Sequence, residues 1–328
     1  MVIHGMGPGL PGALQAAVNA LLEGRPRGPI AQRSARISDC YRGGGRSGTA
    51  IVSDDDVLAY LLARLPATHA AIAAVLRAVK AQTGFTPKTL TDIGAGPGTA
   101  SWAATEAWPA LERVTMIDSS AVFLDMARRL AAASPSKALA HAETKLADVT
   151  RLPDLASSDV VIASYALAEV QGTALTETAM ALWDACGGVL VLVEPGTPAG
   201  YERIVACRSA LLADGARIIA PCPHAAPCPI RAPDWCHFSQ RLPRSRDHMM
   251  VKAANVPFED EKFSYLAVAR DHVVIAPYNA RVLAPPKKDK TGIAMKVCAD
   301  GEISRRRIPK RDRKAFTQHR DVRWGEAL

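Results

Sequence analysis

The sequence predicts an α/β protein built on a doubly wound, Rossmann-like parallel sheet. From Thr89 onward, short apolar runs alternate with helical segments, which is the pattern of parallel strands joined by helices. A glycine-rich loop, 94–98, directly follows the first of these runs. The residues before Thr89 instead place apolar side chains at helical spacing. These three observations favour a Rossmann-like domain preceded by helices.

The N-terminal helices come first in the chain. Apolar residues recur at helical spacing over 10–22. Ser53 precedes three aspartates and an apolar stretch, which predicts a second helix with a capped start. A third helix is expected over 67–82. Residues 1–85 are therefore predicted to form a helical domain.

The strands of the main sheet follow these helices. A late apolar run, Ile293–Cys298, fits the antiparallel hairpin that ends this class of fold. The main domain is therefore expected to span residues 86–300, with a basic C-terminal tail at 301–328. The earlier predicted strands are Thr89–Ile93, Arg113–Ile117, Asp159–Ala163, Gly188–Val193 and Phe263–Ala269.

The glycine loop indicates what the main domain binds. Glycines are needed where the chain turns sharply off a strand and where a Cβ atom would strike a bound nucleoside. A dinucleotide fingerprint would place its third glycine at position 99, but Thr99 stands there, so NAD is the weaker alternative. The spacing suits S-adenosylmethionine better. The loop residues expected to bind it are Asp92, Gly94, Gly96 and Gly98.

Two further acids are expected to contact the nucleoside. Asp118 closes the second predicted strand, where a carboxylate can accept hydrogen bonds from ribose hydroxyls. Asp148 follows the third strand, at 145–147, and is placed to accept a hydrogen bond from the adenine amino group. Each of these acids taken alone is equally consistent with an ordinary helix or turn cap.

The cysteines of the C-terminal half predict a metal or iron–sulfur insertion at 222–298. Three of them lie within fifteen residues on a proline-rich segment that cannot form a regular helix, and a fourth ends a predicted strand. Four thiolates suit tetrahedral zinc or a [4Fe–4S] cluster, and His224 and His237 keep a mixed zinc site open. Buried structural thiols are one alternative, and Pro-Cys nucleophiles like those of RNA 5-methylcytosine enzymes are another. The candidate ligands are Cys222, Cys228, Cys236 and Cys298.

The formal net charge of +8 is concentrated near the C-terminus. Residues 302–328 hold nine Lys/Arg against four Asp/Glu. Such an excess favours contact with a polyanion such as RNA, and a solvated terminus is the alternative. The residues expected to bind RNA are Arg305, Arg306, Arg307, Lys310, Arg311, Arg313 and Lys314.

The expected compartment is the cytoplasm, with no membrane partner. No stretch approaches eighteen uninterrupted apolar residues, and the first residues show no basic segment followed by an apolar one. In a reducing compartment, clustered cysteines are not expected to persist as structural disulfides. This expectation is what makes a metal or cluster the leading explanation of the four cysteines.

Three segments together resemble one family: the loop 92–98, the segment 222–241 and the ending 298–325. The family is the mitochondrial small-ribosomal-subunit methyltransferase-like family, known as an Rsm-type protein in yeast and as methyltransferase-like protein seventeen in animals, and the chain looks like a bacterial member. The resemblance implies a [4Fe–4S] cluster held by the four candidate cysteines. It also implies association with the small ribosomal subunit or its precursor through 16S-type rRNA, where Trp235 and Trp324 can stack on bases.

Methyl transfer has less support in the sequence than cofactor binding. An amine-directed enzyme usually carries an Asn/Asp-Pro-Pro-Tyr-like motif after the fourth strand, where Ser164–Glu169 stands, and no catalytic residue is identified. Glu194 ends the fifth strand and either touches substrate or caps a turn. The leading hypothesis is a small-subunit assembly factor that binds rRNA, S-adenosylmethionine and a [4Fe–4S] cluster. The alternatives are an active rRNA methyltransferase and a zinc-stabilised small-molecule methyltransferase.

Overall fold

A computed structural model describes residues 7, 9–42, 50–152 and 155–328. Its main sheet has the strand order β3-β2-β1-β4-β5-β8-β6, with β7 also paired to β8. The neighbours from β3 to β5 are parallel, whereas β8 is antiparallel to both β5 and β6. This is the doubly wound order with one antiparallel strand inserted before the last, so the predicted Rossmann-like methyltransferase fold is confirmed. The strands are β1 (Thr89–Ile93), β2 (Arg113–Asp118), β3 (Glu143–Leu146), β4 (Ser158–Ser164), β5 (Cys186–Pro195), β6 (Arg217–Ala220), β7 (Phe238–Pro243) and β8 (Phe258–Ala269).

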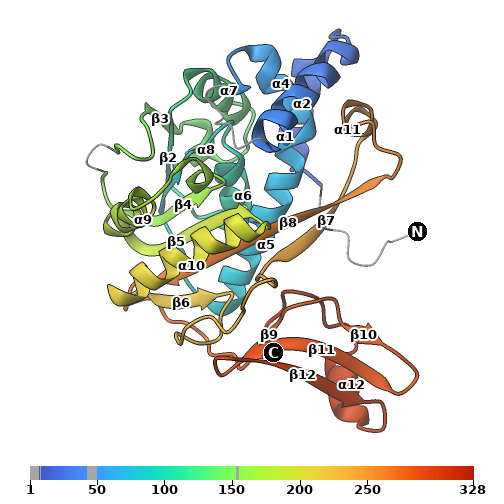
Figure 1. Ribbon diagram of the computed structural model, residues 1–328. Helices are drawn as coiled ribbons and strands as arrows, with labels where there is room; N and C mark the ends of the chain where they lie inside the picture. Colours follow the sequence, from blue (N-terminus) through green and yellow to red (C-terminus); the bar gives the residue numbers. More distant parts are fainter. Residues whose placement is uncertain (1–6, 8, 43–49, 153–154) are drawn as a thin grey trace.

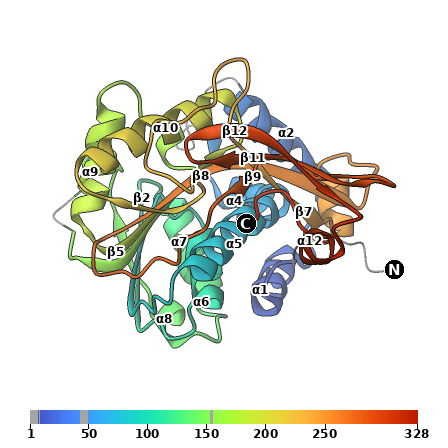
Figure 2. The same cartoon turned by 90° about the horizontal axis from the view of Figure 1, so that it is seen from below.

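Helices cover both faces of the sheet (Figure 1). Figure 2 shows α10 on the opposite side of the sheet from α5 and α6, and two separate hydrophobic clusters fill the two interfaces. In α7, Ser120 accepts the backbone N–H of Phe123 at the helix start, and buried side chains recur on one face as far as Leu130. Each such large side chain contributes about 1.5–3 kcal/mol when fully buried. The helices of this body are α5 (Leu65–Gln82), α6 (Thr99–Ala107), α7 (Ala121–Ala131), α8 (Lys137–Ala140), η1 (Leu167–Glu169), α9 (Ala174–Asp184), α10 (Pro198–Ala213) and α11 (Arg246–Val251).

The N-terminal helices α1 (Gly12–Leu22), α2 (Arg27–Arg42) and α4 (Asp54–Ala63) share the hydrophobic cluster of α5–α7 and have no separate core. The predicted cap of α4 is present, because the Ser53 side chain accepts the N–H of Asp56. Helix α2 was not predicted. Arg33 and Arg36 on α2 bind the fully buried carboxylate of Asp56, the first at 2.8 Å. Residues 1–6, 8 and 43–49 of the predicted helical domain lie outside the described residues.

A second, smaller sheet follows the main one and has its own hydrophobic cluster. It consists of β9 (Arg281–Val282), β10 (Lys287–Lys288), β11 (Gly292–Ala299) and β12 (Glu302–Pro309), with α12 (Arg313–His319) packed beside it (Figure 1). Two predictions are corrected here. The run Ile293–Cys298 is a strand, but it belongs to this second sheet and not to the main one. Residues 301–328 are not a tail, because β12 pairs with β11 along its length and α12 covers the apolar side chains of the pair.

No single helix among the described residues is long and apolar enough to cross a membrane. Helices α4 and α5 meet that length and composition test only as a pair, bent by 55°. Their side chains Leu61 and Leu76 are at most 1% exposed and belong to the main core.

Candidate cofactor loop, cysteine site and basic hairpin

The glycine loop leaves β1 in a conformation that favours glycine. Gly94, Gly96 and Gly98 have φ values of +63°, +54° and +83°, a region that other residues adopt at a cost of about 1–3 kcal/mol. A Cβ at Gly94 would lie 2.5 Å from the Ala166 Cβ, whereas a Cβ at Gly96 would meet nothing within 4 Å. The loop is therefore packed against Ala166 at Gly94 and has free space beside Gly96. Free space beside such a loop is what a bound nucleoside requires.

Asp92 lies behind this loop and is fully buried. Its Oδ2 accepts the backbone N–H of Ser101 at 2.9 Å and the Ser101 hydroxyl at 2.8 Å. Burial raises the pKa of Asp92 to about 7. The carboxyl group thus ties β1 to the first turn of α6, and it holds the loop in place from the core side.

Asp118 binds both the glycine loop and its own turn, whereas Asp148 binds its own turn. Asp118 Oδ2 accepts the N–H of Gly96 at 2.7 Å, and its Oδ1 accepts the N–H of Ser120 at 2.8 Å. Burial raises the pKa of Asp118. Asp148 is exposed, and its Oδ1 accepts both the N–H and the hydroxyl of Thr150. The bonds from Ser120 and Thr150 are those of the cap alternative, whereas the bond from Gly96 joins Asp118 to the glycine loop. A carboxylate has about four acceptor sites and can accept further bonds. Nucleoside binding by the two acids stays a prediction.

A polar network that was not predicted lies at the end of β4. Tyr165 has φ +58°, and its hydroxyl donates to Glu261 Oε1 at 3.1 Å. Arg64, between α4 and α5, pairs with the same carboxylate at 3.1 Å. The partners are 96 and 197 residues apart in sequence, so no local pattern reveals them. Glu194, the other candidate at this edge, is fully buried and pairs with Arg203 at 2.6 Å, so it anchors α10.

Three of the four candidate cysteines line one cavity, and the fourth, on the second sheet, is near enough to interact electrostatically with Cys236. Cys222, Cys228 and Cys236 lie in the loop between β6 and β7 and line one cavity, and Cys298 comes from β11 of the second sheet. The Tyr201 hydroxyl donates to Cys228 Sγ at 3.2 Å. Because β6 is parallel to β1, this site lies at the same edge of the sheet as the glycine loop. Four strand spacings of about 4.8 Å separate the two sites by ~19 Å.

The two histidines of the cysteine segment differ in their surroundings. His224 Nε2 lies 3.3 Å from Cys298 Sγ. His237 stacks on Trp235 with ring centroids 5.0 Å apart, and Trp324 contacts its edge at 5.1 Å. Trp324 therefore pins the C-terminal segment to the body. In the part of the chain that the structure describes, no group of three or more His, Cys, Asp or Glu side chains has the geometry to hold one metal ion.

The donor set and its surroundings nevertheless fit an anionic metal group. All four cysteines are free thiols, and soft thiolates are the ligands of zinc and iron–sulfur sites. Arg208 lines the cavity with three of them, and its charge and that of Arg281 act on Cys222. Both arginines carry a buried side-chain nitrogen without a hydrogen-bond partner. The Pro-Cys nucleophile alternative requires the end of β4, whereas Cys222 follows β6.

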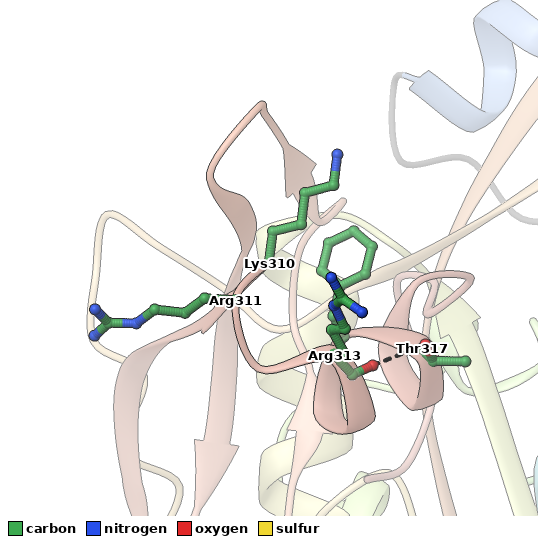
Figure 3. A pocket seen from close by; sticks show the side chains of 5 residues that line it. Lys310, Arg311, Arg313 and Thr317 are labelled. Carbon is green, nitrogen blue, oxygen red and sulfur yellow. Dashed lines mark hydrogen bonds between the residues drawn. The ribbon is translucent and has the colours of Figure 1, made fainter.

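The basic residues lie on folded elements of the second sheet. Residues 302–307 of β12 are all exposed. Residues directly opposite in an antiparallel pair share a face, so Arg305 lies on the face of Lys296, and Arg306 on that of Met295 and α12. Arg307 is bound to Asp289 at 2.9 Å. Figure 3 shows an adjacent hollow, which is lined by Lys310, Arg311, Arg313, Phe316 and Thr317.

Comparison with known proteins gives the following matches. Residues 54–328 match the model of the family described as mitochondrial small ribosomal subunit Rsm22. The human protein described as ribosome assembly protein METTL17, mitochondrial, is 29% identical over 83% of this chain and 62% of its own length. The Rsm22-cox11 tandem protein 2, mitochondrial, of Schizosaccharomyces pombe is 26% identical over 85% of this chain and 44% of its own length. The chain thus spans about half to three-fifths of the curated relatives it matches.

One solved structure with a similar fold is magnesium protoporphyrin IX methyltransferase from Synechocystis PCC 6803. It is 13% identical, has a TM-score of 0.42, and the match covers 71% of this chain and 94% of that chain. The fold assignment rests on the strand order given above and does not depend on this likeness.

Proposed function

This chain belongs to the mitochondrial small ribosomal subunit Rsm22 family, and we propose that it is an assembly factor of the small ribosomal subunit. In this proposal it binds 16S-type rRNA or the subunit precursor, S-adenosylmethionine and a [4Fe–4S] cluster. The observation that carries it is that Cys222, Cys228 and Cys236 line one cavity, with Cys298 near them on the strand paired to the arginine-rich β12. The human relative METTL17 is described as a ribosome assembly protein, which supports the same role.

The proposed RNA contact is the basic hairpin formed by β11 and β12, together with the hollow beside α12. Arg305 and Arg306 lie on opposite faces of β12, and Lys310, Arg313 and Phe316 all line the hollow. Lysine and arginine side chains neutralise phosphates, and an aromatic ring accepts a stacked base. This combination suits irregular or single-stranded rRNA better than a regular duplex.

The proposed S-adenosylmethionine site is the open side of the glycine loop. Two observations support it: a Cβ at Gly96 would meet nothing within 4 Å, and Asp118 at the end of β2 lies 2.7 Å from the Gly96 N–H. An acid at the end of this strand is suited to accept hydrogen bonds from ribose hydroxyls. Bound there, S-adenosylmethionine supplies an activated methyl group. The chain's own contribution is to hold the nucleoside through the loop backbone and the carboxylate of Asp118.

The proposed cluster is tested by anaerobic purification with absorption spectroscopy and analysis of iron, sulfide and zinc. About four irons and four sulfides per chain are expected. Stoichiometric zinc without sulfide would contradict the cluster, and it would favour the zinc-stabilised small-molecule methyltransferase. RNA affinity that does not fall with rising salt would contradict the rRNA role. Fractionation of cells tests the cytoplasmic location, which stays a prediction.

Active rRNA methyl transfer is the second candidate. The observation that favours it is the network of Tyr165, Glu261 and Arg64 at the end of β4, next to the glycine loop, where an acceptor would approach. Transfer of labelled methyl from S-adenosylmethionine to precursor small-subunit rRNA tests it, with Gly96→Ala as the cofactor-site control. Label in RNA that requires Gly96 would establish catalysis. Equal background in both proteins would leave the assembly role without catalysis.

A further inference from the structure

Two buried arginines beside the cysteine site have no carboxylate partner. Arg208 on α10 is 4% exposed, and Arg281 on β9 is 2% exposed. Within the described ranges, no Asp or Glu oxygen lies within 4.0 Å of either guanidinium. Their hydrogen bonds go to backbone carbonyl oxygens: Arg208 Nη2 to His224 (2.9 Å) and Ala226 (2.8 Å), and Arg281 Nε to Pro221 (2.7 Å) and Nη1 to Gly325 (2.9 Å).

Each guanidinium also keeps one donor unused. Arg208 Nε and Arg281 Nη2 are buried without a hydrogen-bond partner. A buried unpaired donor costs about 1–3 kcal/mol, and more on a charged group, and buried charges in proteins are normally paired. The site as folded polypeptide therefore holds two positive charges that lack an anion.

The thiols are the groups placed to supply that anion. Arg208 lines the same cavity as Cys222, Cys228 and Cys236. Arg281 Nε donates to the carbonyl oxygen of Pro221, the residue directly before Cys222. Four thiolates around a zinc ion, or around a [4Fe–4S] core of charge +2, leave a net charge of about −2. Two guanidinium groups balance that charge.

We infer that Arg208 and Arg281 are the counter-charges of the group held by the four cysteines. They are positioning residues, which stabilise the anionic, thiolate-bound form of the site through charge and N–H donors. The inference rests on the proposed function only in that a metal group binds the cysteines. It holds equally for a cluster and for zinc.

The main test compares apo and loaded protein in the variants Arg208→Gln and Arg281→Gln. Apo protein is reconstituted with ferrous iron and sulfide, and separately with zinc alone. We expect loading to raise Tm less in the Gln variants than in the original chain. In the apo state the Gln variants should melt at or above the original chain, because an unpaired buried cation has been removed. Equal destabilisation of apo and loaded protein would show a merely structural role and overturn the inference.

Two further sets of variants control this comparison. Arg208→Lys and Arg281→Lys keep the charge and should retain most of the loading effect. Arg217→Gln is the exposed-arginine control, since Arg217 also donates to carbonyl oxygens, those of Asp271 and Val273, from the other end of β6. Should the apo chain itself fail to fold, extraction of metal by a chelator decides. The Gln variants should then lose metal at least tenfold faster than Arg217→Gln, and equal rates would refute the inference.

The reduction potential of the iron–sulfide-loaded protein gives an independent readout. Removing a positive charge disfavours addition of an electron, so the Gln variants should require a lower potential for half-reduction. A tenfold change in the ratio of oxidised to reduced protein corresponds to ~59 mV for one electron, and a shift of about this size is expected. An unchanged potential in both Gln variants would contradict the inference. If the original chain takes up neither iron–sulfide nor zinc, the cysteine part of the proposed function fails instead.

Discussion

The glycine loop and the cysteine site lie at the same edge of one sheet, but the chain assembles them in different ways. The glycine loop is a contiguous segment, 92–98, whose conformation is set by its own backbone and by bonds to Ser101 and Asp118. The cysteine site takes its thiols from the loop between β6 and β7 and from β11, and two buried arginines beside it have no carboxylate partner in the described structure. The first is formed by one local segment, and the second, in the function proposed above, is completed by the group that its cysteines bind. The two regions should therefore fail under different perturbations.

The largest effect is expected at the cysteine site. Cys298→Ser removes the one proposed ligand that comes from the second sheet. Metal should therefore be lost and residues 220–300 should become less stable, because bound metal supplies ordering energy. Iron and sulfide analysis with thermal melting checks this, and Cys228→Ser should behave alike. Cys40→Ser, on α2, is the control. Full metal content and an unchanged Tm in Cys298→Ser would contradict the claim that the cysteine site, unlike the glycine loop, depends on bound metal.

The glycine loop should respond to a single Cβ atom and not to metal. Gly94→Ala combines a left-handed φ with a 2.5 Å contact to Ala166, so a loss of about 2–4 kcal/mol of unfolding free energy is expected. Gly96→Ala meets open space and should cost about 1–2 kcal/mol. The Gly96 variant should nevertheless weaken S-adenosylmethionine binding, measured by calorimetry. Unchanged affinity in Gly96→Ala would place the ligand elsewhere.

The pH dependence of the unfolding free energy tests the glycine loop alone, because the buried carboxyl group of Asp92 lies behind this loop. The folded-state pKa of Asp92, raised by burial to about 7, lies above its ordinary value of 3.8. The folded chain therefore holds this proton more tightly than the unfolded chain, and the stability gained is full below pH ~4 and is lost as pH rises through ~7. Asp92→Asn should flatten the denaturant-midpoint profile over that window by the order of a few kcal/mol. Burial also raises the pKa of Glu194 to about 7, so part of the pH dependence of stability should remain in Asp92→Asn. The exposed-site control is Asp125→Asn, and a profile as steep in Asp92→Asn as in the original would contradict the assignment.

The smallest expected effect concerns the basic hairpin next to the cysteine site. Removing two phosphate contacts by Arg305→Ala with Arg306→Ala should reduce the salt slope of RNA binding by about 1.4. Adding Arg307→Ala should change little, because Asp289 already pairs with Arg307.

If RNA enters the hollow of Figure 3, Arg306→Ala alone should cost more affinity than Arg305→Ala, since Arg306 shares the face of α12. Filter binding at several salt concentrations measures both effects. Arg320→Ala, paired with Asp321, is the control.

The sequence predicts the regions whose contacts are local and misses those whose partners are distant. The strands from Thr89 to Val193 and the glycine loop carry their own patterns of apolar residues and glycines, and the structure has them within one or two residues of the predicted bounds. Helix α2 was missed because Arg33 and Arg36 suggested a basic surface. In the structure they pair with Asp56, which is 23 and 20 residues later in the chain.

The placement of the later elements could not be read from the sequence. Ile293–Cys298 has the apolar pattern of a strand, but nothing in that pattern says which sheet it joins. The grouping of the cysteines followed from their spacing and from the family resemblance, whereas Arg208 and Arg281 come to the site from a helix and from the second sheet. Tyr165, Glu261 and Arg64 likewise come from distant parts of the sequence. Each requires the folded backbone to bring its members together.

Strand β12 is the last strand of the second sheet, so one side of its backbone has no strand partner among the described residues. An open edge of this length can pair with the same edge of another copy and start aggregation. The arginines of β12 would then lie beside those of the second copy, and like charges repel across such a short gap. The arginines of the hairpin proposed to bind RNA therefore also oppose edge-to-edge pairing of two copies. This repulsion weakens at high salt, because the screening length falls to about 3 Å at 1 M.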